Sequence, residues 1–171
     1  MPTFALSIAG IALIYLWTIS MQRSLAALDE NAGSAMSQIG VQLSGRFDAL
    51  MMLLYLTRDH ASCECDMLIE TVSSRKRMIT AKSEPDDVLQ QEGIIAEALN
   101  RIEQLTAKYP ELKSDPNYIE MTGAVDAFEK MIRTSCLVYN DSVKKLNQRI
   151  QIFPFIIIAR ISGLRKKDYL K

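Results

Sequence analysis

Histidine is almost absent from this sequence, whose 171 residues include one histidine, three cysteines, five prolines and seven glycines. A ferritin-like di-iron bundle uses a Glu-x-x-His pair on each of two helices, so a single histidine excludes that class of protein. The small number of glycines and prolines favours helices over a sheet with many turns. The 20 basic and 20 acidic side chains balance, so no net charge attracts the chain to nucleic acid. With 49% hydrophobic residues, the chain has ample material for the core of one domain.

Motifs that bind nucleotides or form covalent intermediates are also missing. The sequence contains no G-x-x-x-x-G-K phosphate loop, no G-x-G-x-x-G and no G-x-S-x-G. Cys63 and Cys65 would point about 200° apart on a helix, so they cannot easily form a disulfide with each other. Cys136 has no obvious partner nearby in the sequence, so we interpret all three cysteines as small apolar core residues. The sequence therefore predicts a non-enzymatic protein without a cofactor.

A weak metal site is one alternative. His60 and Glu64 lie one helical turn apart with Cys63 between them, an arrangement that offers ligands to a divalent ion such as iron. A polar contact on the surface of a helical bundle is the competing interpretation of the same pair. Loss of stoichiometric metal binding in a His60→Ala variant would separate the two.

The N-terminal segment lacks charge altogether. No charged side chain occurs from Pro2 to Gln22, and about 20 apolar residues of helix cross a hydrocarbon core of roughly 30 Å. Residues 1–22 are therefore predicted to form a transmembrane anchor, with Tyr15 and Trp17 near one interface. A cleaved signal peptide is the alternative, but it would need a basic segment at its start and a shorter apolar core.

The rest of the chain has helical patterning. After Pro116, apolar or small residues recur at alternating steps of four and three, the repeat of a left-handed bundle. They are Met121, Val125, Phe128, Ile132, Ser135, Tyr139, Ser142 and Leu146. This helix is predicted to begin behind Ser114 or Asp115 and to end at Pro154. Further helices are predicted over 23–45, 47–81 and, behind a Ser83 cap, 85–109. The fold prediction is all-α, an anchor followed by an antiparallel up-and-down four-helix bundle over residues 23–154.

Residues 155–171 form an apolar and basic C-terminal tail. An up-and-down bundle returns Pro154 to the membrane surface, where isoleucines would meet acyl chains and basic residues would meet lipid phosphates. The residues predicted at this interface are Phe155, Ile156, Ile157, Ile158, Arg160, Arg165, Lys166 and Lys167. The alternative is that the isoleucines cap the open end of the bundle core.

Three blocks of the sequence resemble the LemA family in the right order, namely "AMSQIGVQLSGRFDAL", "AKYPELKSDPNYIEM" and "YNDSVKKLNQRIQIFP". Several family residues are replaced, which indicates a specialised branch. Met36 stands for the usual Trp, Gly40 for Asp, Met51-Met52 for Pro-Asn and Cys63-Glu64 for His-Glu. The magnetosome-associated branch is similar in two short patterns. These are Thr57, His60, Ala61 and Glu64, and Gly163, Arg165, Lys166 and Tyr169.

The resemblance implies a membrane-anchored helical bundle without an established reaction, and its branch implies a role in building a compartment derived from the inner membrane. Tyr139, Asn140 and Asp141 are expected to hold the bundle together or to contact a partner helix. We therefore predict a membrane-anchored scaffold in the bacterial inner membrane or a magnetosome membrane. Its expected partners are lipids and other membrane proteins, not nucleic acid, and self-association stays open. The positive-inside tendency favours a cytoplasmic bundle. An enzyme of unrecognised type and a LemA-family protein of another role are the further alternatives.

Overall fold

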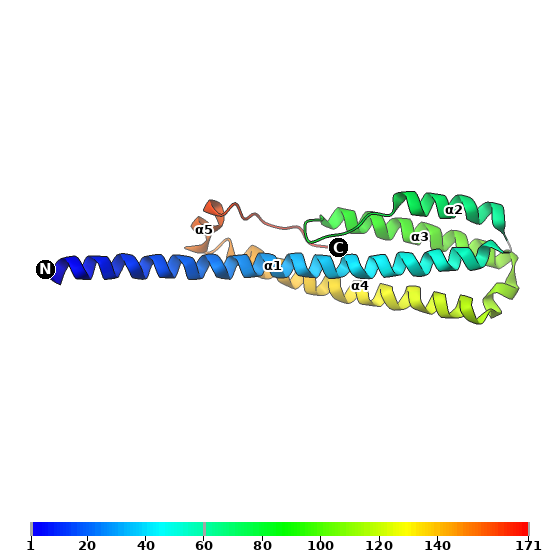
Figure 1. The fold of residues 1–171 in the computed structure, drawn as a ribbon, viewed down its shortest axis with the longest axis horizontal. Coiled ribbons are helices and arrows are strands. Elements are labelled where there is room, and N and C mark those ends of the chain that lie inside the picture. The colour runs from blue at the N-terminus through cyan, green and yellow to red at the C-terminus, as the bar shows by residue number, and fades with distance from the viewer. Residues whose placement is uncertain (1, 60, 171) are drawn as a thin grey trace.

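The computed structural model describes residues 2–59 and 61–170, with side chains described from residue 10 onward, and this part of the chain is all-helical. Five α-helices and one 3-10 helix follow each other along an elongated molecule (Figure 1). They are α1 (Pro2–Arg58), α2 (Ser62–Arg75), α3 (Pro85–Lys108), η1 (Pro110–Ser114), α4 (Pro116–Arg149) and α5 (Phe155–Ile161). The all-α prediction is confirmed.

Helix α1 is continuous over 57 residues and runs past the rest of the molecule at the N-terminal end (Figure 1). The predicted end of a helix at Gly45 is therefore wrong. A Cβ atom on Gly45 would lie 2.5 Å from two ring atoms of Phe128 in α4. Gly45 thus allows an aromatic ring of α4 to lie against the α1 backbone, and it does not interrupt the helix.

The predicted helix over 47–81 is also wrong, because the chain turns after Arg58 and α2 ends at Arg75. Residues 76–84 form no regular secondary structure and lie against α1. The side chain of Gln91 in α3 fixes this segment, since its Oε1 accepts from the Arg77 N–H at 2.8 Å and its Nε2 donates to the Arg75 carbonyl at 3.3 Å. Gln91 is buried, so these bonds satisfy an amide that would otherwise be costly there.

Side chains cap two of the helices. Asp115 is the N-cap of α4, as predicted, and its carboxylate accepts from the N–H groups of Asn117 and Tyr118. The predicted Ser83 cap of α3 is wrong, because Glu84 is the N-cap and forms a capping box with Asp87. The Ser83 hydroxyl accepts instead from the Thr80 N–H, within the preceding turn.

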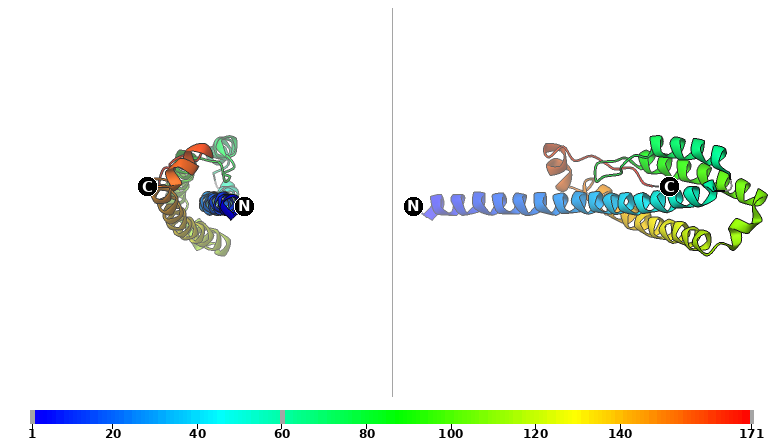
Figure 2. Two further views of the ribbon diagram at one scale, coloured as in Figure 1. Left: turned by 90° about the vertical axis from the view of Figure 1, so that its left-hand side faces the viewer. Right: turned by 45° about the vertical axis from the view of Figure 1, so that its right-hand side comes forward.

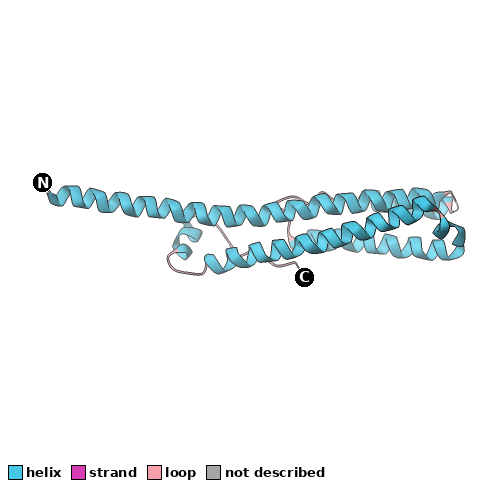
Figure 3. Cartoon of the chain, turned by 90° about the horizontal axis from the view of Figure 1, so that it is seen from below, coloured by secondary structure: helices cyan, strands magenta, loops and turns pink. Residues whose placement is uncertain are grey.

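The packing is centred on α1, which contacts α2, α3 and α4, while α2 also contacts α3. Figures 2 and 3 show α4 running back along α1, with α2 and α3 on another side of α1. The buried positions of α4 follow the predicted seam up to Tyr139 and then shift from Ser142 to Val143. They are Val125, Ile132, Ser135, Tyr139, Val143, Leu146 and Asn147. The main core lies where these residues meet α1.

Candidate functional site

The N-terminal part of α1 is apolar and uncovered. Large side chains from Ile11 to Trp17 are exposed, and the first buried side chain of α1 among the described ones is Met21. Within the described residues, α1 alone is long and apolar enough to cross a membrane, and it lies near the N-terminus. Bare apolar helix thus changes to packed helix at about the end of the predicted anchor.

Helix α5 packs against α1 at this boundary. Ile158 and Ala159 are buried with Met21 and Leu25 of α1 in a second, smaller core cluster. The prediction that Ile158 faces lipid is therefore wrong, and for this residue the alternative of an end cap is correct. Five large apolar side chains of the same region stay exposed. They are Ile152, Phe153, Ile156, Ile157 and Ile161, and we call them the α5 apolar patch.

The basic residues near α5 separate into two groups. Arg160 is exposed in the last turn of α5, and the guanidinium of Arg149 lies 4.9 Å from the ring centre of Phe155. Beyond Gly163 the chain leaves α5 and runs back along α4 (Figure 1). The predicted grouping of Lys167 with the isoleucines is wrong, because its Nζ pairs with Asp29 of α1 at 2.8 Å. Arg165 and Lys166 are exposed on the same returning segment.

Two asparagines of α4 hold the backbone of this C-terminal segment. The Asn147 amide donates to the Lys167 carbonyl at 2.8 Å and accepts from the Lys167 N–H at 3.0 Å. The Asn140 amide makes the same pair of bonds to Leu170, at 2.8 Å and 2.9 Å. Each amide therefore satisfies both backbone groups of one residue. Asn147 was not among the predicted site residues, although it lies seven residues after Asn140 and so on the same helix face.

Tyr139 adds a third contact to the segment. Its hydroxyl donates to the Asp168 carbonyl at 3.1 Å, and its side chain is buried in the main core. Burial raises the pKa of the Tyr139 phenol, and the negative charge of Asp168 raises it further, so the phenol stays protonated and remains a donor. Asp141 lies apart from this group, exposed and paired with Lys145 at 2.6 Å. Of the predicted trio, the structure thus brings Tyr139 and Asn140 together at the C-terminal segment and leaves Asp141 outside it.

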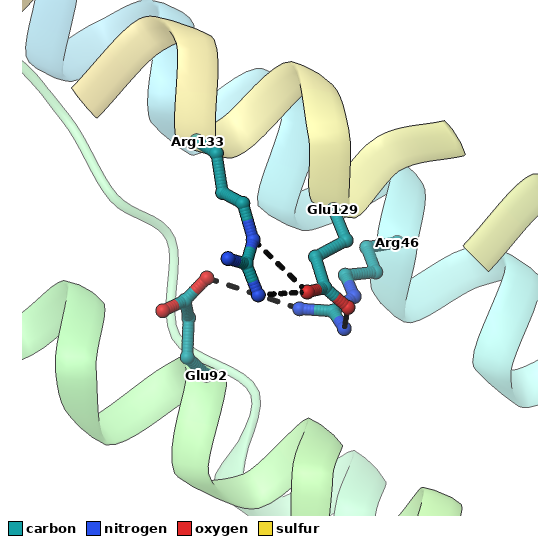
Figure 4. A network of polar contacts seen from close by, with 4 residues as sticks. All are labelled: Arg46, Glu92, Glu129 and Arg133. Atoms are coloured by element: carbon teal, nitrogen blue, oxygen red, sulfur yellow. Dashed lines mark hydrogen bonds and ion pairs between the residues drawn. The ribbon is translucent and has the colours of Figure 1, made fainter. Parts of the chain in front are cut away.

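A network of charges ties α1, α3 and α4 together in the body of the molecule (Figure 4). The buried Arg46 of α1 donates to the carboxylate of Glu129 at 2.7 Å and lies 3.8 Å from that of Glu92. Arg133 also donates to Glu129, and this hydrogen bond and the Arg46 charge lower the pKa of the Glu129 carboxyl. Because both carboxylates are engaged by arginines, the network supports packing and offers no free acid or base.

The metal and thiol predictions have mixed outcomes. His60 lies outside the described residues, and the Glu64 carboxylate is exposed and pairs with Lys108 at 3.3 Å. The residues that the structure describes contain no group of three or more potential metal ligands. Cys65 is buried, as expected for a core residue, and burial raises the pKa of its thiol. Cys63 is exposed, so its interpretation as a core residue is wrong.

A family model and one curated relative match this chain. The relative is magnetosome protein MamQ of Magnetospirillum gryphiswaldense, 23% identical over 191 residues that cover 96% of this chain and 70% of MamQ. The model of the LemA family matches residues 35–171, which run from within α1 through α5 and the returning C-terminal segment. Most of the chain is therefore covered by the family match, including both asparagines that hold that segment. The chain belongs to the LemA family.

Proposed function

We propose that this protein is a non-enzymatic, membrane-anchored helical scaffold that serves in building or remodelling a bacterial membrane compartment of the magnetosome kind. The observation that carries the proposal is the continuity of α1. Its bare apolar segment passes without a break into the helix that organises the core. The similarity to a magnetosome protein supports the choice of compartment.

A continuous helix fixes the orientation of its two ends relative to each other. At 1.5 Å per residue, α1 is about 85 Å long, and roughly 30 Å of helix is enough to cross the hydrocarbon core. Because α1 has no interruption between the two parts, the helical body stands at a fixed angle to the anchor. A scaffold can use this geometry to present the same face of α1 and α4 to neighbouring membrane proteins.

The α5 apolar patch lies at the level where the body meets the membrane, since α5 packs on Met21 and Leu25. In this arrangement Ile156 and Ile157 contact the upper acyl chains, while Arg149 and Arg160 lie close to lipid phosphates. Burial of the exposed isoleucines in lipid removes apolar surface from water, which favours a body that rests on the bilayer. The excess of basic residues in this region favours the cytoplasmic side.

The test uses the full chain in vesicles made of brominated or ordinary phospholipids. Trp17 is the single tryptophan. In a Trp17→Phe background, Ile157→Trp places one fluorophore on the α5 apolar patch, and Leu137→Trp places one on a site of α4 that is also exposed. Leu137 lies 13 residues before Ile150, the C-cap of α4, which belongs to the smaller core cluster with Met21 and Leu25. This separation corresponds to about 20 Å along α4.

We expect brominated lipids to quench the fluorophore at 157 and to leave the one at 137 unaffected. Equal quenching of the two would contradict a resting place for α5 on the bilayer. Release of the full chain from native membranes by alkaline carbonate would contradict the anchor itself. In cells, replacing α1 residues 1–22 with an unrelated anchor should preserve membrane attachment, and deleting the protein should alter the compartment.

A further inference from the structure

The C-terminal segment is held in the manner of a bound peptide. Its residues from Leu164 to Leu170 form no regular secondary structure, and three side chains of α4 bond its main-chain atoms. Gly163, with φ of +71°, turns the chain out of α5 immediately before this segment. The segment is thus an extended piece that lies against α4 and α1 and connects to α5 through a short turn. We call the surface that holds it, which includes Asp29, Tyr139, Asn140 and Asn147, the groove.

The spacing of the two asparagines matches an extended chain. Asn140 and Asn147 are two turns apart on α4, about 10.5 Å along its axis. Lys167 and Leu170 are three residues apart, about 10 Å in an extended strand. The pairing of 147 with 167 and of 140 with 170 shows that the segment runs antiparallel to α4. Because both amides bond only main-chain atoms, this part of the recognition does not depend on the peptide's sequence.

Two side chains of the segment supply sequence selectivity. Leu170 is 6% exposed and belongs to the main core cluster, whereas Lys167 pairs with Asp29 of α1. Asp168 and Tyr169 between them are exposed. The groove therefore reads the pattern Lys-x-x-Leu. A cleft of about 750 Å³ lies beside the segment, lined by Asp29, Tyr139 and Lys167 among others, so one side of the segment is open.

We propose that this groove is a peptide-binding site for an extended Lys-x-x-Leu segment, and that the C-terminal segment of a second copy of this chain occupies it between molecules. A second copy offers the same main-chain atoms, lysine and leucine, so exchange replaces every contact with an identical one. The asparagines, Tyr139 and Asp29 all belong to the helical body, and hence the site is complete without its own tail. The proposal does not depend on the scaffold function.

The first experiment separates the segment from a chain that has already folded. A protease recognition sequence is inserted between Leu164 and Arg165 of the full chain in detergent and is cut after folding. We expect the cut segment to remain bound and to exchange with a fluorescein-labelled peptide of residues 165–171, RKKDYLK, seen as a saturable rise in anisotropy. Asn147→Asp replaces a donor amide with a carboxylate that repels the Lys167 carbonyl, so the peptide should bind about tenfold more weakly or worse.

Matched controls keep this result specific. Asp141→Asn changes a neighbouring exposed residue outside the groove and should leave the affinity unchanged. A peptide with Leu170→Asp should lose binding, because the leucine site lies in the core. A cut chain that keeps its helical circular dichroism but takes up no labelled peptide would overturn the proposal. Equal binding by the Asn147→Asp variant would overturn it too.

The second experiment asks whether two copies exchange segments. One copy keeps the groove and lacks residues 165–171. The other keeps the segment and carries Asn140→Asp and Asn147→Asp, which disable its own groove. We expect the two, carrying different tags, to be captured together in detergent and to separate when excess RKKDYLK peptide is added. Should the first copy bind the peptide and fail to capture the second copy, a second copy would be excluded as the occupant.

Discussion

Gly40→Ala is a sharp test of how residues 76–84 lie on α1. A Cβ atom added to Gly40 would lie 2.2 Å from the carbonyl oxygen of Ile79, 2.9 Å from its carbonyl carbon and 3.1 Å from its Cβ. Two of these atoms are backbone atoms that Gln91 helps to fix through the neighbouring Arg77. The clash can be relieved only by moving the whole segment away from α1.

The expected change in the free energy of unfolding follows from two opposing contributions. Overpacking of this kind costs about 1–3 kcal/mol in the free energy of unfolding. Alanine in place of glycine within a helix gains up to about 1 kcal/mol. Gly123 in α4 provides the matched control, because nothing lies within 4 Å of a Cβ added there. Gly123→Ala should therefore stabilise the protein, and Gly40→Ala should be about 1–3 kcal/mol less stable than Gly123→Ala.

Urea unfolding of the full chain in mild detergent, followed by far-ultraviolet circular dichroism, measures both variants. The comparison requires that the slope of the free energy with urea be the same in each, so that the midpoints report stability. Equal midpoints for Gly40→Ala and Gly123→Ala would refute the close contact between Ile79 and α1.

Three further predictions concern the body of the molecule. Arg46→Met leaves Glu92 and Glu129 without their shared partner and should cost about 1.5–3 kcal/mol, measured by the same urea unfolding. The pKa of Glu129 lies below its ordinary 4.5 in the folded state, so its contribution to stability is present above pH 4.5 and is lost as the pH falls through the folded pKa. Glu129→Gln should therefore lose less stability than the wild type on acidification across that range. Phe128→Asp places a charge beside Gly45 on the seam of α4 and should abolish cooperative unfolding, whereas Phe128→Leu should not.

The sequence predicts α4 well and α1 poorly, for a physical reason. Periodicity over many residues, with Asp115 as a cap, identifies α4 because every repeat adds the same information. Gly45 is compatible with two structures, the end of a helix and a close contact within a continuous helix. A glycine that ends a helix and a glycine that admits the Phe128 ring look the same along the chain, and only the position of α4 separates them.

Residues 76–81 fall within the predicted helix over 47–81, and their own composition does not oppose a helix. Their observed conformation depends on partners from other elements. Gln91 satisfies backbone groups at Arg75 and Arg77, and Gly40 makes room for Ile79. Such contacts appear only when the helices are placed in space, so local propensity cannot reveal them.

For the candidate site, too, the sequence predicts some of the residues and misses others. The sequence identified Tyr139 and Asn140, which do contact the C-terminal segment, and it included Asp141, which faces solvent. Adjacent helical residues point about 100° apart, so the three could not all face one groove. The spacing of Asn147, seven residues after Asn140, was the available signal for the third α4 residue that holds the segment. The partner atoms are main-chain atoms, which no side-chain pattern could have indicated.

The three isoleucines of α5 do not share one environment. Three consecutive isoleucines cannot share one face of a helix, and the structure buries Ile158 while Ile156 and Ile157 stay outside. Ile158→Ser should therefore lower stability by about 2 kcal/mol or more, since it removes a buried apolar side chain and introduces a hydroxyl. Ile157→Ser should leave urea unfolding almost unchanged, because that side chain is 51% exposed and belongs to neither core cluster. A tryptophan placed at position 156 reports lipid contact through its quenching by brominated lipids. If Ile157→Ser weakens that quenching, the exposed half of α5 contacts lipid. No quenching of the tryptophan at position 156, with or without Ile157→Ser, would show that α5 serves the core alone.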